Sequence, residues 1–442
     1  MITSFSLKNF KSYKEAEMPL ATLTFFIGPN ASGKSNALEA IRLLSWMAKG
    51  SRLDDIERSI QGADSLLRGQ PADLFLDGEN GFEIGCRVEG NVESWNQLSL
   101  KISLVDDHLI ITGESVSKES EAIALYSVDS PPNARTDEIR VAYNNFKQGR
   151  NKPHIPCSNR QAIFYQLDTP ARFEKANEKS QKIIPAVAKR FRHALRTIVF
   201  LDPQPALMRG YSFAKDSEMK ENGSNLSSVL YNICEGDGPL KKELLDFVRS
   251  LPEQDIKDIS FIVTDRNDVM VVLKESFGSK EKAMDAPVLS DGTLRVLATG
   301  ATLLSAPQGS LVIVEEIDNG VHPSRAELLI KQIIRIGKKR KLKVLLTSHN
   351  PALLDALPDD SLGDVLCCYR DPEFGDSRIV RLGDLDRFPE LMAQGTLGEL
   401  VTKQVLDRFL KDKTTPEERK QEALSWLNDF KKGVSDECHL FD

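Results

Sequence analysis

The sequence has no long uninterrupted apolar run, and this absence removes one class of protein at the outset. None of its apolar stretches approaches the roughly 20 residues that a membrane-spanning helix needs. The N-terminal segment MITSFSLKNFKSYKEA is polar and charged, which is not typical of a secretory signal. We therefore expect a cytoplasmic protein with no membrane partner.

Cysteine is scarce and shows no pattern. The chain has 6 cysteines among 442 residues, without a C-x-x-C pair or a regular spacing. This usage favours reduced thiols over a disulfide framework or a zinc site. The vicinal pair Cys367 and Cys368 lies in a run typical of a strand, and we expect both thiols to be buried without a chemical role. The remaining four are Cys86, Cys157, Cys234 and Cys438.

Neither sign of charge dominates. The 58 Lys and Arg residues against 65 Asp and Glu residues give a net charge of -7, so the chain as a whole does not attract nucleic acid. The strongest basic run, KQIIRIGKKRKLK at 331–343, favours a charged surface helix, although a contact with DNA phosphates stays open.

The sequence also lacks internal repeats and a sustained heptad pattern in residues 130–280, so we expect no coiled-coil arms. Its length exceeds what one compact core usually holds. Alternating strands at 81–128 predict an antiparallel meander, whereas helices and apolar strands alternate from residue 288 onward. We predict four units: 1–129, 130–287, 288–385 and a helical tail at 386–442.

The segment GPNASGKS at 28–35 matches the spacing G-x-x-x-x-G-K-S, between an apolar strand and a helix start. Gly28 and Gly33 are expected to leave room for phosphate, Lys34 to face the β and γ phosphates, and Ser35 to contact Mg²⁺. ATP and Mg²⁺ are thus the predicted cofactors. The full predicted ATP-binding loop is Gly28, Pro29, Asn30, Ala31, Ser32, Gly33, Lys34, Ser35 and Asn36.

An apolar strand that ends in two acids, LVIVEEIDNGVHP at 311–323, provides a second motif. Hydrolysis of a phosphoanhydride needs one carboxylate near Mg²⁺ and one that polarises the attacking water. Neighbouring side chains of a strand point to opposite faces, so two neighbours that serve one site require the strand to end there. We predict Glu315 as the metal-side carboxylate and Glu316 as the general base.

Two further motifs involve a helix start and a strand end. In VLSDGTL, Ser290, Asp291 and Gly292 directly precede or begin a helix, where Ser290 or Asp291 is a plausible N-cap. The same helix end favours a phosphate, and because the first loop already serves one ATP, we expect this phosphate on a second copy of the chain. His349 ends the strand in KVLLTSHNP and is predicted to contact the γ-phosphate.

This order of motifs resembles the ABC-type ATPases, with a Walker A loop (GPNASGKS), a signature (LSDGT), a Walker B strand (LVIVEE) and an H-loop (TSHNP). The segment SFSLKNFKSYKEAEMPL ahead of the loop, Asn36 directly after it, and the EE pair before a D-x-G-x-H-P turn are similar to RecF, SMC and OLD-like ATPase heads. Residues 199–231 resemble compact bacterial "AAA family" ATPases. The resemblance implies an α/β fold: an ABC-type P-loop NTPase head with an N-terminal antiparallel β subdomain, a central mostly parallel sheet and a helical lobe.

The chain departs from the family pattern in three places. The signature reads LSDGT rather than LSGGQ, and Glu315 replaces the usual aspartate, which is one methylene shorter. The Q-loop glutamine cannot be placed, since Gln148, Gln161 and Gln166 all remain candidates.

The tail carries no strand pattern of a TOPRIM nuclease, and we interpret it as a packing or oligomerisation element. The leading hypothesis is therefore an ATPase that dimerises through composite ATP sites and regulates a separate effector, such as a nuclease or toxin in bacterial anti-phage defence. The alternative is a RecF/SMC-like ATPase that clamps DNA in repair or chromosome maintenance. A transporter subunit is disfavoured, because the SLKNFKSY strand and the EE pair fit the DNA-linked branch better.

Overall fold

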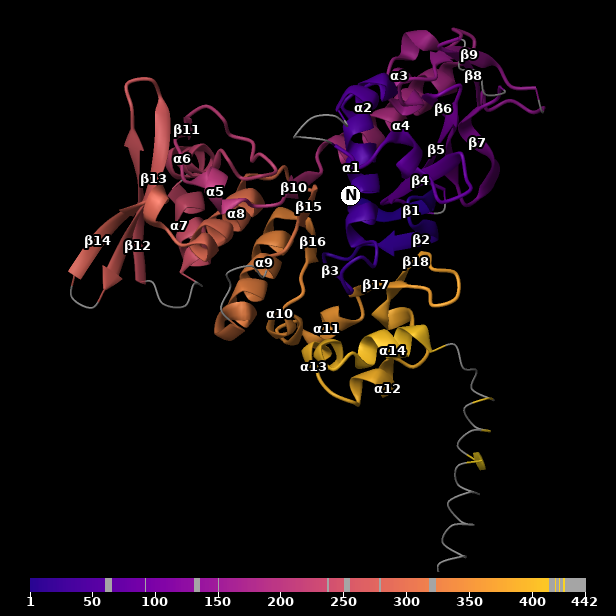
Figure 1. Cartoon of the computed structure of the whole chain (residues 1–442). Coiled ribbons are helices and arrows are strands. Elements are labelled where there is room, and N and C mark those ends of the chain that lie inside the picture. The colour runs from indigo at the N-terminus through magenta and orange to yellow at the C-terminus, as the bar shows by residue number, and fades with distance from the viewer. Residues whose placement is uncertain are drawn as a thin grey trace, which may run out of the picture.

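Three sheets organise the chain. The computed structural model describes residues 1–59, 66–91, 93–130, 136–149, 151–236, 238–249, 255–277, 280–317, 323–412 and positions 418, 421, 424 and 425. In Figure 1 an N-terminal β lobe and a helical lobe flank the strands of a central sheet, and the C-terminal helices lie below it.

The N-terminal lobe is an eight-stranded antiparallel sheet, as the alternating sequence predicted. Helices α1 (Lys34–Ala48), α2 (Leu53–Ser59), α3 (Ile163–Gln166) and α4 (Glu178–Arg196) belong to this part of the chain. The strand order is β2 (Tyr13–Pro19), β1 (Ile2–Phe10), β4 (Gly81–Val88), β5 (Gln97–Val105), β6 (His108–Lys118), β7 (Glu121–Val128), β8 (Glu138–Tyr143) and β9 (His154–Ser158).

This sheet does not break at residue 130, where the sequence suggested the end of the first unit. Strand β8 pairs with β7 and β9 pairs with β8, so the segment that follows the proline-rich linker returns to the same sheet. The last residues of the second expected linker, 147–156, form the start of β9, which pairs with β8. Backbone pairing with β7 and β8 thus outweighs the loop-like composition of these segments.

The central sheet is mostly parallel, which confirms the predicted fold class. Strands β10, β15, β16, β3 and β17 run parallel, and only β18 is antiparallel. Its order is β10 (Val199–Leu201), β15 (Leu311–Val314), β16 (Lys343–Thr347), β3 (Leu23–Ile27), β17 (Leu366–Arg370) and β18 (Ser377–Arg381). The strands β3 and β15 are apolar throughout, or nearly so, because both faces of a parallel sheet are covered.

The helical lobe contains its own small sheet. The helices predicted near 225–233 and 241–251 are present as α6 (Leu226–Gly236) and α7 (Gly238–Val248). Both contact the sheet formed by β11 (Ser212–Phe213), β13 (Asp268–Phe277), β12 (Asp255–Val263) and β14 (Lys280–Asp285). The sequence did not predict β14. Helices α5 (Pro205–Met208) and α8 (Asp291–Ser305) complete the lobe.

The remaining helices come after strands of the central sheet in the chain. They are α9 (Ala326–Arg340), α10 (Pro351–Asp355), α11 (Asp359–Leu362), α12 (Phe388–Met392), α13 (Leu397–Thr402) and α14 (Val405–Lys411), with 3₁₀ turns at Pro71–Leu74, Pro170–Arg172, Ala286–Val288, Pro323–Arg325 and Leu382–Asp384. The tail docks where Gly398 N–H donates to Asp355 at 2.6 Å. Within the described ranges, every helix is too short or too polar to cross a lipid bilayer.

The basic run of α9 has partners inside the chain. Lys339 donates to the buried Glu243 at 2.9 Å, and Lys331 pairs with Glu327 one turn away. Arg340 donates to the main-chain oxygen of Ala306. These contacts fit the interpretation of this run as a charged surface helix.

A buried acid, Glu114 of β6, links the N-terminal sheet to α3. Its carboxylate accepts hydrogen bonds from the Tyr126 hydroxyl at 2.7 Å and from the N–H groups of Ile163 and Phe164 at 2.6 Å. Burial raises the pKa of Glu114 to about 7, although the three donated hydrogen bonds act in the opposite direction. The protonated form is therefore favoured in the folded state relative to the unfolded chain.

Because of this raised pKa, Glu114 should make stability depend on pH. Between pH 4.5, its ordinary pKa, and about 7, the unfolded chain releases a proton that the folded chain retains. The free energy of unfolding should then fall as pH rises through this window, by up to ~1.4 kcal/mol per pH unit. Denaturant titrations of the wild-type chain and of Glu114→Gln at several pH values measure it. The Gln variant should lose this slope, and equal slopes in both proteins would contradict the assignment.

Candidate functional site

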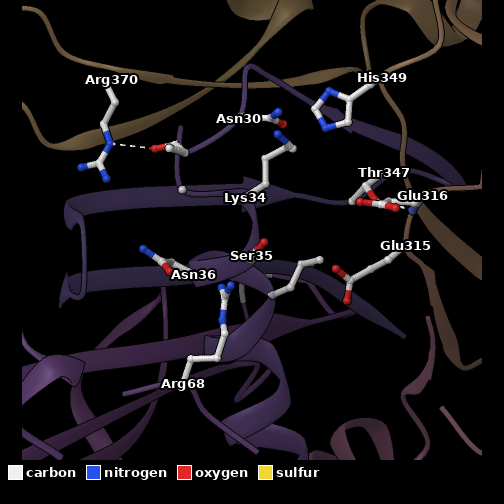
Figure 2. A pocket seen from close by; sticks show the side chains of 13 residues that line it. Asn30, Lys34, Ser35, Asn36, Arg68, Glu315, Glu316, Thr347, His349 and Arg370 are labelled. Atoms are coloured by element: carbon white, nitrogen blue, oxygen red, sulfur yellow. Dashed lines mark hydrogen bonds between the residues drawn. The ribbon is translucent and has the colours of Figure 1, made fainter. Parts of the chain in front are cut away.

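Three of the four predicted nucleotide motifs meet in one pocket of about 370 Å³ (Figure 2). Most of its lining comes from the glycine loop with the start of α1, the end of β15 and the end of β16, and Arg68 and Arg370 add to it from two further segments. The carboxyl ends of parallel strands meet at one edge of a sheet, and ligands commonly bind there. The lining residues are Asn30, Ala31, Gly33, Lys34, Ser35, Asn36, Leu38, Arg68, Glu315, Glu316, Thr347, His349 and Arg370.

The two glycines of the loop are required by close packing against the C-terminal hairpin. Gly28 has φ 150°, and a Cβ there would lie 2.1 Å from the main-chain oxygen of Cys368. Gly33 has φ 118°, and a Cβ there would lie 2.3 Å from Ser377 Oγ. The sequence explained these glycines by clearance for phosphate. The structure adds a second reason, because the β17–β18 hairpin leaves no room for a side chain.

The loop is held from two sides by hydrogen bonds. From the hairpin, Ser377 Oγ donates to the Ser32 carbonyl at 2.5 Å, and Arg370 Nε donates to the Ala31 carbonyl at 3.1 Å. From the start of β2, the Tyr13 hydroxyl donates to the Gly33 carbonyl at 3.0 Å. The Ser32 side chain is buried and its hydroxyl has no hydrogen-bond partner. The loop conformation is thus fixed by neighbours that lie far away in the sequence.

Lys34 at the start of α1 faces the pocket. Its ammonium group donates to the carbonyls of Gly28 at 2.6 Å and Pro29 at 3.0 Å, so it folds back onto its own loop. Burial lowers the pKa of Lys34, while the nearby charge of Glu316 acts in the opposite direction. A partly buried cation with an incomplete set of strong acceptors is well placed to bind an anion.

The two acids follow the strand, as expected from their shared role. Strand β15 ends at Val314, so Glu315 and Glu316 both lie beyond the alternating pattern and both line the pocket. Glu316 has φ 48°, a conformation that non-glycine residues rarely adopt, and its N–H donates to Thr347 Oγ1 at 2.9 Å. The turn that the sequence predicted after this pair, 318–322, lies outside the described residues.

Arg42 of α1 pairs with Glu315, which the sequence did not predict. Its guanidinium group forms ion pairs with Glu315 and with Glu221. Burial raises the pKa of Glu315, and the positive charge of Arg42 lowers it. Asp202, directly after β10, is also near: burial raises its pKa and the charge of Glu316 adds to this. These acids come together because β10 and β15 are parallel neighbours.

The signature residues lie outside this pocket. Ser290 is exposed and caps α8, because its hydroxyl accepts the Thr293 N–H at 3.1 Å. Asp291 pairs with Arg209, and Gly292 is buried in the first turn of the helix. Of the two expected N-cap candidates, Ser290 is the one that caps α8. This end of the helix lies at the surface of the helical lobe.

None of the three candidate Q-loop glutamines lines the pocket. Gln148 is exposed, the Gln161 amide donates to the Gly50 carbonyl, and the Gln166 amide bridges main-chain groups of Ser158. The residue that directly follows β10, the strand next to β15, is Asp202 and not a glutamine.

Four residues at the site escaped the sequence analysis: Arg42, Arg68, Asp202 and Arg370. Asp202 could have been found, since it follows an expected strand in the same way as the EE pair does. Arg68 pairs with the buried Glu39 of α1, which places its side chain at the pocket. No local signal in the sequence marks the three arginines.

Comparisons with known proteins identify the family of the chain. A family model described as "AAA domain, putative AbiEii toxin, Type IV TA system" matches residues 23–355. The chain belongs to this family and is accordingly an ATPase. An "ATP/GTP phosphatase" of Helicobacter pylori is 23% identical over 367 residues, which cover 81% of this chain and 87% of that protein.

Relatives from the DNA-linked branch match over shorter stretches. A RecF protein of Leptospira biflexa, described as a "DNA replication and repair protein", is 31% identical over 129 residues, or 28% of this chain and 31% of RecF. The resemblance to RecF/SMC-type ATPase heads is thereby confirmed. Among solved structures, an SMC head bound to the C-terminal winged-helix domain of ScpA covers 86% of this chain and 97% of its own, with 14% identity and a TM-score of 0.45.

Replacement of Lys34 tests the pocket. Lys34→Ala removes the only ammonium group that lines the pocket among the described residues, so ATP affinity should fall by about 10- to 100-fold while the fold persists. Isothermal titration with ATP measures this. Lys49→Ala, at the exposed far end of α1, is the matched control and should bind as the wild type does. Unchanged affinity in Lys34→Ala would refute the assignment.

Proposed function

We propose that this ATPase binds ATP and Mg²⁺ in the pocket described above, closes into a dimer with composite ATP sites, and thereby regulates a separate effector. The observation that carries the proposal is the separation of two elements that we expect to bind phosphate, the glycine loop and the start of α8. The glycine loop, the EE pair and His349 share one pocket, whereas Ser290 lies exposed at a different surface. A second copy of the chain can bring the two together.

The residues present fit a magnesium ion. The Ser35 hydroxyl and the Glu315 carboxylate line one pocket beside the phosphate loop, and Mg²⁺ prefers oxygen ligands of these types. Within the described residues, no group of three or more His, Cys, Asp or Glu side chains could hold a metal by itself. This suits Mg²⁺, which takes part of its coordination from substrate phosphates.

Each side chain then has a defined task in hydrolysis. The loop amides and Lys34 hold the β and γ phosphates, and Ser35 and Glu315 would hold the metal, which would supply positive charge against the charge that develops on the phosphates. Glu316, which lines the same pocket as Lys34, accepts a proton from the attacking water. His349 contacts the γ-phosphate, and Ser290 of a second copy completes the site from the opposite side.

The effector is proposed to be a nuclease or toxin that acts in bacterial defence. The family description names a toxin and a toxin–antitoxin system, which supports this class. Of the tail, α12 to α14 dock on the chain through buried Leu391, Leu397, Leu400 and Leu406, in the manner of a packing element. We place the effector contact on the helical tail or on the middle segment.

Two substitutions test the composite site together. Glu316→Gln removes the general base, so hydrolysis should slow by about 100-fold or more while the ATP-bound dimer accumulates. Ser290→Arg should prevent closure and leave ATP binding to a single chain intact. Mass measurement in solution with ATP and Mg²⁺ reads out both. Hydrolysis at the parental rate in Glu316→Gln, or normal closure of Ser290→Arg, would show that the mechanism is wrong.

The local matches to RecF favour one alternative, a DNA-clamping ATPase in repair or chromosome maintenance. The two proposals differ in their dependence on salt. An effector regulator with net charge -7, whose basic helix is paired internally, should bind bare duplex DNA weakly. Tight binding that falls steeply between 50 and 200 mM salt, measured by fluorescence anisotropy with ATP present, would favour the DNA clamp.

A further inference from the structure

Arg42 provides an internal cation at the carboxylate side of the pocket. Its Nη2 donates to Glu315 at 2.5 Å and also to Glu221. Both members of the Arg42–Glu315 pair are largely shielded, with side-chain exposures of 16% and 19%. The guanidinium carbon lies 5.2 Å from the centre of the Phe200 ring, which holds the cation from another side. Arg42 of α1 is therefore held by side chains from three other segments: Phe200 of β10, Glu221 before α6 and Glu315 after β15.

The pairing of Arg42 is incomplete. A well-formed contact between arginine and a carboxylate uses two nitrogens against two oxygens. Here Nη2 alone serves both carboxylates, and the buried Nε has no hydrogen-bond partner. A buried donor without an acceptor is unfavourable, so this pair is weaker than a fully matched one. It is an ion pair in which another cation can replace the guanidinium group at Glu315.

Two acids depend on Arg42, because its guanidinium group forms ion pairs with both Glu315 and Glu221. Lys34 lies beside Glu316, and Arg295 acts on Asp202, but neither forms an ion pair with Glu315. Without Arg42, Glu315 would be a largely shielded carboxylate that has lost its ion-pair partner, and carboxylate oxygens attract divalent cations.

We propose that Arg42 is a positioning residue that occupies Glu315 as an internal counter-ion, so that a divalent cation enters the site only together with the nucleotide. The inference rests on the proposed metal role of Glu315. Nucleotide phosphates supply further ligands and negative charge, which allows a metal to compete with the guanidinium group. With Glu315 paired to Arg42, the chain should have little affinity for a metal added without nucleotide.

Binding of Mn²⁺ to the nucleotide-free protein tests this, with electron paramagnetic resonance as the readout. Arg42→Met should bind Mn²⁺ about tenfold more tightly than the wild type, or better, because one positive charge at the carboxylates is lost. Arg42→Lys keeps the charge and should resemble the wild type. Arg381→Met is the matched control, since Arg381 also bridges two carboxylates, Asp364 and Asp384, but lies away from the pocket. It should show no such gain.

A double variant assigns the gain to Glu315. Arg42→Met with Glu315→Gln should return Mn²⁺ binding to the wild-type level. Thermal unfolding with and without Mn²⁺ gives a second readout, because a ligand that binds the folded state raises its stability. Equal Mn²⁺ affinity in Arg42→Met and wild type, or an equal gain in Arg381→Met, would overturn the inference. Arg42→Gln serves the same comparison if Arg42→Met does not fold. These outcomes are independent of ATP-dependent closure of Glu316→Gln, which tests the proposed function itself.

Discussion

The position of β3 between two hydrophobic cores is the constraint on which the rest of the molecule depends. All five of its residues are buried. Phe26 packs into the core under the N-terminal sheet, whereas Leu23, Phe25 and Ile27 pack into the core of the helical and C-terminal parts. A strand without a polar face must lie in the interior of a sheet, and this one ends where the glycine loop begins. The burial of both faces of β3 therefore fixes the loop at the edge of the sheet where the polar residues that follow β15 and β16 also lie.

The loop depends as much on the C-terminal half of the chain as on its own sequence. Cys368 and Ser377 approach Gly28 and Gly33 so closely that any other residue would force the hairpin away. Arg370 and Ser377 also hold main-chain carbonyls of the loop. A phosphate loop needs its amides preorganised, because the binding energy would otherwise be spent on ordering them. The β17–β18 hairpin supplies this order from more than 300 residues away.

The sequence predicted those parts of the site that consist of local patterns. The glycine loop, the acids at the end of β15 and His349 after β16 each combine an apolar strand with a polar terminus, and all of them line one pocket. The partners of these groups could not be predicted, because Arg42–Glu315 and Ser377–Ser32 join segments whose proximity is decided only by strand order. The same reason explains β8 and β9, where pairing with β7 outweighed a loop-like composition. Short strands such as β10 were predicted, but their place beside β15, and so the role of Asp202, was not.

The helical lobe is connected to the candidate site through the short segment that follows β10. After β10, the Asp202 N–H donates to the Glu221 carbonyl at 2.8 Å, and the Gln204 N–H donates to the Asn222 carbonyl at 3.1 Å. The Glu221 side chain reaches Arg42, so the loop before α6 is tied to α1, which begins at the phosphate loop. Helix α6 in turn packs against α8, whose first turn carries Ser290. A continuous set of contacts thus leads from Glu315 through Arg42 and Glu221 to the lobe that presents Ser290.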